Sequence, residues 1–202
     1  MAVAMTGCAS VQLGKNKDEA AAAATAEERE AMAVALERLE DNPWDGQEAE
    51  GGDAFMTVLF GGSGPSPKDE AKAYLSGLEV SEGDKPSAVL RDVDVTLAAA
   101  WHMVDAGRAA SESVQPQQSD VRMVEEAITE ARHCRLVYAQ AMNLMAKDGL
   151  DVAREDVIYV KDEFTRAILE LGRTADALSK RVNARRPEAF ASEPSMALTS
   201  SY

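Results

Sequence analysis

Glu130 and His133 are the residues whose types and spacing come closest to a catalytic pattern. They lie three positions apart in the stretch Glu130-Ala131-Arg132-His133, within a segment whose apolar periodicity predicts a helix. One helical turn would separate them, so a carboxylate and an imidazole would face the same site. Both are ligands that transition metals accept in proteins. The pair is therefore a candidate for metal-dependent chemistry.

This spacing resembles one half of the site in ferritin-like di-iron bundles. Those proteins need Glu-x-x-His on two helices, together with a Glu from each of two others. The only other histidine is His102, and the residue three positions before it is Ala99. His133 also lies off the apolar stripe of its segment. We therefore expect an exposed or rim histidine, no metal site and no cofactor, with a ferritin-like metal-dependent protein using Glu130 and His133 as the alternative.

The other chemistry-bearing residues give no catalytic set. Cys134 falls within the apolar stripe, where a cysteine behaves as a small hydrophobic residue and its thiol is poorly ionised. The Gly-rich stretch 61–67 (GGSGPSP) lacks the Lys-Ser/Thr pair of a phosphate-binding loop. No Ser-His-Asp set can be argued from the sequence. We expect a protein that is not an enzyme.

The stretch Met5-Thr6-Gly7-Cys8 resembles the lipobox of bacterial lipoproteins. The apolar Met5 stands three positions before the cysteine, and two small residues, Thr6 and Gly7, lie between them, as that motif requires. The resemblance implies that Cys8 is lipidated and becomes the first residue of the mature chain. Ala9 and Ser10 lack the acidic residue typical of inner-membrane retention, so it implies an outer-membrane anchor facing the periplasm. The alternative is a cytosolic helical adaptor with a free Cys8.

The residues before Cys8 are fewer than a secretory signal needs. Seven residues precede it and none is Lys or Arg, whereas a signal has a basic region followed by about 7–15 apolar residues. We therefore expect the natural start to lie upstream, or the sequence to have been trimmed.

Three long segments have apolar residues at helical spacing: 86–111, from after Ser119 to about 148, and 152–185. The connections between them are short, which forces neighbouring helices to run antiparallel. In the third segment the spacing approximates a heptad, which predicts shallow packing angles. We expect an all-α fold, an elongated up-down antiparallel bundle of three long helices plus one or two shorter ones.

Two shorter helices are predicted from their N-terminal signals. Thr25 and Glu28 form a capping box that predicts a helix over 26–40, and Ser66 before Pro67 predicts one over 67–78. The predicted organisation is a signal remnant (1–8), a flexible tether (9–25), a bundle (26–186) with an irregular insertion (41–66), and a disordered tail (187–202).

Composition limits the partners. The chain has 202 residues, 46% of them hydrophobic, and a formal net charge of −14, which disfavours binding to nucleic acid. No apolar run reaches the roughly 18 residues of a transmembrane helix. We expect a non-catalytic binding or structural module of the cell envelope, held at the membrane by its lipid and contacting a protein partner there. The sequence leaves the oligomeric state open.

Overall fold

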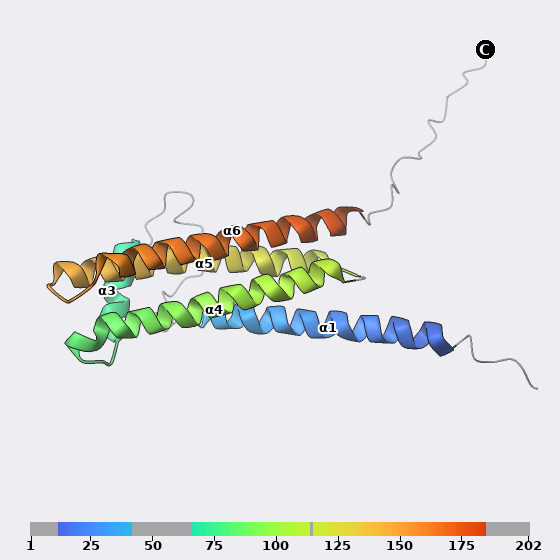
Figure 1. Ribbon diagram of the computed structural model, residues 1–202, viewed down its shortest axis with the longest axis horizontal. Coiled ribbons are helices and arrows are strands. Elements are labelled where there is room, and N and C mark those ends of the chain that lie inside the picture. The colour runs from blue at the N-terminus through green and yellow to red at the C-terminus, as the bar shows by residue number, and fades with distance from the viewer. Residues whose placement is uncertain (1–11, 42–65, 114, 185–202) are drawn as a thin grey trace, which may run out of the picture.

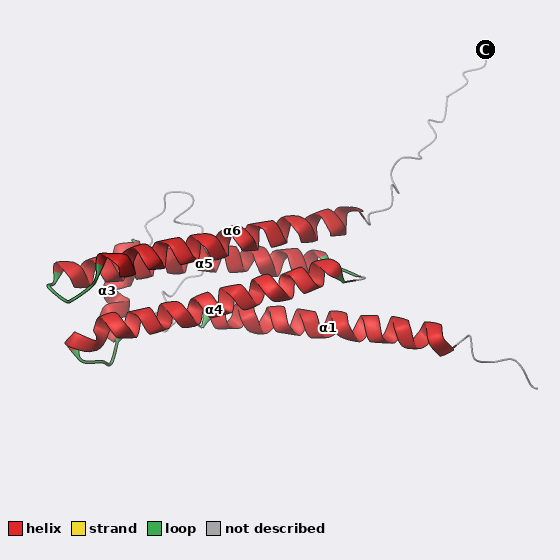
Figure 2. Ribbon diagram, viewed as in Figure 1, coloured by secondary structure: helices red, strands yellow, loops and turns green. Residues whose placement is uncertain are grey.

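The computed structural model describes residues 12–41, 66–113 and 115–184, and every regular element within these ranges is helical (Figure 2). This confirms the predicted all-α class. The predicted signal remnant (1–8), the predicted disordered tail (187–202) and residues 42–65 of the predicted irregular insertion lie outside the described residues. In chain order the elements are α1 (Gln12–Glu40), α3 (Pro67–Gly77), the short 3-10 helix η1 (Glu82–Asp84), α4 (Lys85–Glu112), α5 (Gln118–Lys147) and α6 (Arg154–Ala184).

The four long helices α1, α4, α5 and α6 alternate in direction and form an elongated bundle (Figure 1). α4 and α5 pack against each other and each also packs against both α1 and α6. α1 and α6 lie on opposite sides of the α4–α5 pair. The short connections reverse the chain, as predicted. The α5–α6 connection contains Gly149, which follows the C-cap Asp148 and takes a positive φ of 83° where α5 ends.

The direction of the helices decides what lies at each end of the bundle. The start of α1 and the end of α6 are at the same end, together with the α4–α5 connection (Figure 1). At the other end α3 crosses the bundle and packs on α5. Ser66 caps α3 as predicted, because its Oγ accepts a hydrogen bond from the Asp69 backbone N–H at 3.3 Å.

The first helix is longer than the sequence predicts. α1 begins at Gln12, so helix replaces the flexible tether expected over 9–25 from that residue onward. Thr25, the expected N-cap, is a buried residue inside the helix. A run of alanines precedes Thr25, and alanine has the highest helix propensity of any residue type. Extending a helix that is already nucleated costs far less than starting one, so the capping box does not begin a new helix, and the bundle has four long helices instead of three.

The predicted apolar stripes form one continuous core. Leu90, Trp101, Ile128, Ile168 and Val182, which lie in the three long predicted helical segments, are only partly buried and pack against it. Methionines fill several of its central positions, as expected for a flexible gap-filling side chain. The largest fully buried side chains are Tyr138, Phe164, Met32, Leu39, Met103, Met142, Met145, Leu171, Leu178, Val89, Val93 and Val104.

α4 and α6 approach each other closely at Gly107. A Cβ atom at this position would lie 2.7 Å from Thr174 Cγ2 and 3.2 Å from Val124 Cγ2. The Thr174 methyl cannot move aside cheaply, because Thr174 is β-branched and its Oγ1 donates a hydrogen bond to the Glu170 carbonyl at 2.9 Å. The absence of a side chain at Gly107 therefore sets the spacing of these two helices.

We expect Gly107→Ala to destabilise the fold by about 1 kcal/mol or more, because overpacking outweighs the better helix propensity of alanine. Adding Thr174→Ser, which removes the clashing methyl, should restore part of the loss. Gly172 is the control: a Cβ there meets no atom within 4 Å, so Gly172→Ala should stabilise by about 0.5–1 kcal/mol. Thermal unfolding followed by circular dichroism measures all three. A Gly107→Ala chain as stable as Gly172→Ala would contradict the close approach.

Candidate functional site

The structure places Glu130 and His133 beside different neighbours. His133 Nε2 lies 3.2 Å from Glu70 Oε2 of α3, so its imidazole meets a carboxylate that sequence spacing did not indicate. Glu130 instead lines a groove with Glu40 of α1. Among the described residues, no three His, Cys, Asp or Glu side chains converge as metal ligands. The Glu70–His133 contact is one of the contacts between α3 and α5.

Cys134 is completely buried in the core, as predicted. It lies one turn from Tyr138, whose ring stacks on Phe164 with centroids 6.1 Å apart and meets Tyr74 edge-on at 5.6 Å. This aromatic cluster joins α3, α5 and α6.

Two hydrogen bonds complete the cluster. The Tyr74 hydroxyl donates to Asp92 Oδ2 at 2.7 Å, and the Tyr138 and Thr96 hydroxyls are hydrogen-bonded at 3.1 Å. Burial raises the pKa of both tyrosines far above the ordinary value, and the bond to Asp92 raises the pKa of Tyr74 further. Both hydroxyls therefore stay protonated within the cluster.

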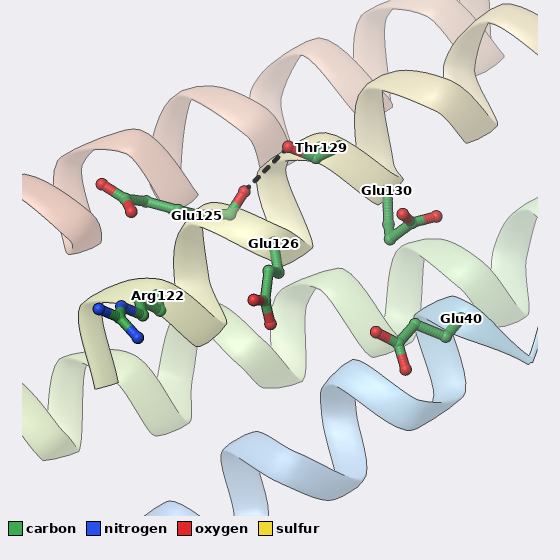
Figure 3. Close-up of a pocket in the computed structure, with 6 residues that line it drawn as sticks. All are labelled: Glu40, Arg122, Glu125, Glu126, Thr129 and Glu130. Atoms are coloured by element: carbon green, nitrogen blue, oxygen red, sulfur yellow. Dashed lines mark hydrogen bonds between the residues drawn. The ribbon is translucent and has the colours of Figure 1, made fainter. Parts of the chain in front are cut away.

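An acidic groove of about 320 Å³ lies between the end of α1 and α5 (Figure 3). Glu40 enters it from α1, and the remaining lining residues come from α5. Four carboxylates and one guanidinium line it, which favours cationic groups over anionic ones. The lining residues are Glu40, Arg122, Glu125, Glu126, Thr129 and Glu130.

A second groove, of about 580 Å³, lies on the other flank of α1 and is walled by α4. His102 is found here, exposed to solvent. We call this second groove the α1–α4 groove. Apolar periodicity does not predict this groove, although Glu27, Glu30, Val34 and Arg38 recur at helical spacing on the polar side of α1. A valine among charged residues on that side was the available signal. The residues are Glu27, Glu30, Ala31, Val34, Ala35, Arg38, His102, Asp105 and Ala106.

An ion pair between α1 and α5 fixes the helix that walls both grooves. Arg29 Nε donates to Asp120 Oδ1 at 2.8 Å, and Arg29 Nη2 donates to the Gln115 carbonyl at 2.7 Å. The Asp120 side chain is only 1% exposed, and its Oδ2 also accepts the Gln117 backbone N–H at 2.7 Å. Asp120 thus caps α5 and binds α1 at the same time.

Glu28 lies next to this ion pair. Partial burial raises its pKa above the ordinary 4.5; Arg29 lowers the pKa, and the charges of Asp120 and Glu112 raise it further. Its Oε2 is buried without a hydrogen-bond partner. An ionised Glu28 therefore costs folding free energy in a way that a neutral side chain would not.

No protein-family model, no curated protein and no solved structure matches this chain. Within residues 12–41, 66–113 and 115–184, none of the helices combines the length and apolar character needed to cross a bilayer.

We expect Asp120→Ala to destabilise the protein by about 3 kcal/mol, because it leaves a partly buried guanidinium and the end of α5 without their partner. Hydrogen exchange should also accelerate in α1. Glu125→Ala, on an exposed carboxylate of the same helix, is the control and should stay within about 0.5 kcal/mol of the parent. Urea unfolding measures both variants. Equal losses in the two would show that the Arg29–Asp120 pair does not hold α1 in place.

We expect Glu28→Gln to raise the melting temperature at neutral pH. The folded-state pKa of Glu28 is raised, so just above pH 4.5 the folded chain binds more protons than the unfolded one. The contribution of Glu28 to stability therefore increases as the pH falls through this window. In Glu28→Gln the side chain at this position does not titrate. The difference in melting temperature between variant and parent should therefore vanish near about pH 3, where the parent carboxyl is protonated in both the folded and the unfolded state. Melting curves at the two pH values test this; an unchanged advantage at acid pH would contradict it.

Proposed function

We propose that this protein is a lipid-anchored, periplasm-facing lipoprotein whose helical bundle is a non-catalytic binding or structural module of the cell envelope. The single observation that carries the proposal is the lipobox-like Met5-Thr6-Gly7-Cys8, placed a few residues before the first helix of a folded bundle. Lipidation of Cys8 with more than one acyl chain would give stable membrane attachment. The absence of an acidic residue at Ala9 and Ser10 supports the outer membrane as its location.

The mechanism we propose is tethering. An anchored bundle is confined to the membrane surface, which raises its effective concentration for any partner held there. Grooves lie on both flanks of α1, and such surfaces suit binding along a helix more than turnover of a small substrate. The placement of Glu130 and His133 beside different neighbours supports the non-catalytic interpretation.

Intact-mass measurement of the native product tests the anchor. We expect a mature chain that begins at Cys8 and carries acyl mass, recovered in the membrane fraction. Cys8→Ser is the matched control and should leave the leader uncleaved and the chain without acyl mass. A native product that retains the seven residues before Cys8 and carries no acyl mass would overturn the proposal and favour a cytosolic adaptor.

Metal analysis of the same preparation separates the proposal from the ferritin-like alternative. We expect no stoichiometric iron, manganese or zinc. Stoichiometric metal that is lost in His133→Gln and Glu130→Gln would instead favour the metal-dependent protein.

A further inference from the structure

The α1–α4 groove has an apolar floor and a charged rim. Ala31, Ala35 and Ala106 contribute only methyl groups to the floor, and Val34 is an exposed apolar residue, 39% accessible, between them. These short side chains leave the groove hollow between the two helices. A ligand with its own apolar ridge can therefore approach closely, as helices do when ridges pack into grooves.

The dimensions of the groove match a short helix. Its α1 wall runs from Glu27 to Arg38 with steps of three and four residues, which spans about 16 Å at 1.5 Å per residue. Three turns of a ligand helix cover the same length. Helix-in-groove recognition places apolar anchors at i, i+3 or i+4, and i+7, a spacing that three turns supply.

The charges on the rim of the groove favour a ligand of positive charge. Glu27, Glu30 and Asp105 place three carboxylates along the groove, against one guanidinium from Arg38. The whole chain carries a formal charge of −14, so the field beyond the groove has the same sign. A cationic ligand is attracted and correctly oriented, whereas an anionic one is repelled.

We propose that the α1–α4 groove binds a cationic amphipathic helix of a protein partner. The proposal rests on the binding-module function above and names its partner class. The apolar ridge of the partner packs over Ala31, Val34 and Ala106, and its lysines or arginines face Glu27, Glu30 and Asp105. Arg38 lies at the other end of the α1 wall and favours the carbonyl end of the partner helix, where the helix dipole is negative.

A pair of labelled model peptides tests the proposal on the full chain in solution. One peptide has leucine and lysine at amphipathic helical spacing, and the other has glutamate in place of each lysine. Fluorescence anisotropy should show saturable binding of the lysine peptide and none of the glutamate peptide. Equal binding of both would overturn the charge argument.

Matched variants locate the binding. Ala31→Phe fills the floor of the groove without changing the charge, and Ala177→Phe places the same side chain on an exposed position of α6, on the opposite side of the bundle. We expect about a tenfold loss of affinity with Ala31→Phe and no loss with Ala177→Phe. Circular dichroism confirms that both variants fold. Unchanged affinity in Ala31→Phe would overturn the proposal.

Charge reversal separates the groove from the general acidity of the chain. Asp105→Lys on the groove rim and Asp176→Lys on α6 alter the net charge equally. Only Asp105→Lys should strongly weaken binding of the lysine peptide. Equal weakening in both would mean diffuse attraction and would overturn the site. Dimerisation that Ala31→Phe abolishes, or tighter peptide binding after removal of residues 187–202, would assign the groove to a second copy or to the chain's own tail.

These assays do not depend on the lipid. A native product without acyl mass would end the envelope proposal but leave the groove intact. Failure of the peptide assays would end the groove proposal and leave the anchor untouched.

Discussion

The ion pair between Arg29 and Asp120 is the constraint on which the arrangement of α1 depends. Asp120 is almost completely buried, and a buried carboxylate is tolerated only when it is paired and hydrogen-bonded. Arg29 and the Gln117 N–H meet that need together. The first helix is thereby joined at one point to the α4–α5 connection and the start of α5, which lie far from it in sequence. Because α1 walls both grooves, their shapes depend on this contact.

The fold could be predicted to the extent that it follows from local rules. Apolar periodicity located the long helices, and Ser66 with Pro67 located the start of α3. The start of α1 was not predictable from the capping box, because the signal at Thr25 competes with the propensity of the alanine run and with propagation from a packed helix. The close α4–α6 contact at Gly107 was also hidden, since nothing in a sequence shows that a glycine in one helix faces a threonine in another.

The surface features were less predictable than the core. The burial of Cys134 followed from its place in an apolar stripe. The partner of His133 is Glu70, on a helix whose crossing of the bundle depends on tertiary packing. The α1–α4 groove is formed by residues that are polar or small, and sequence periodicity assigns such residues to solvent. Its outline appears only when two helices are placed side by side.

The even number of long helices has a consequence for how the molecule can be handled and displayed. Because the directions alternate, the first residue of α1 and the last residue of α6 emerge at the same pole (Figure 1). A fluorophore, affinity handle or solid support attached directly at either of these two residues therefore lies at this pole. The pole crossed by α3 is the opposite one, so attachment at these residues leaves it open.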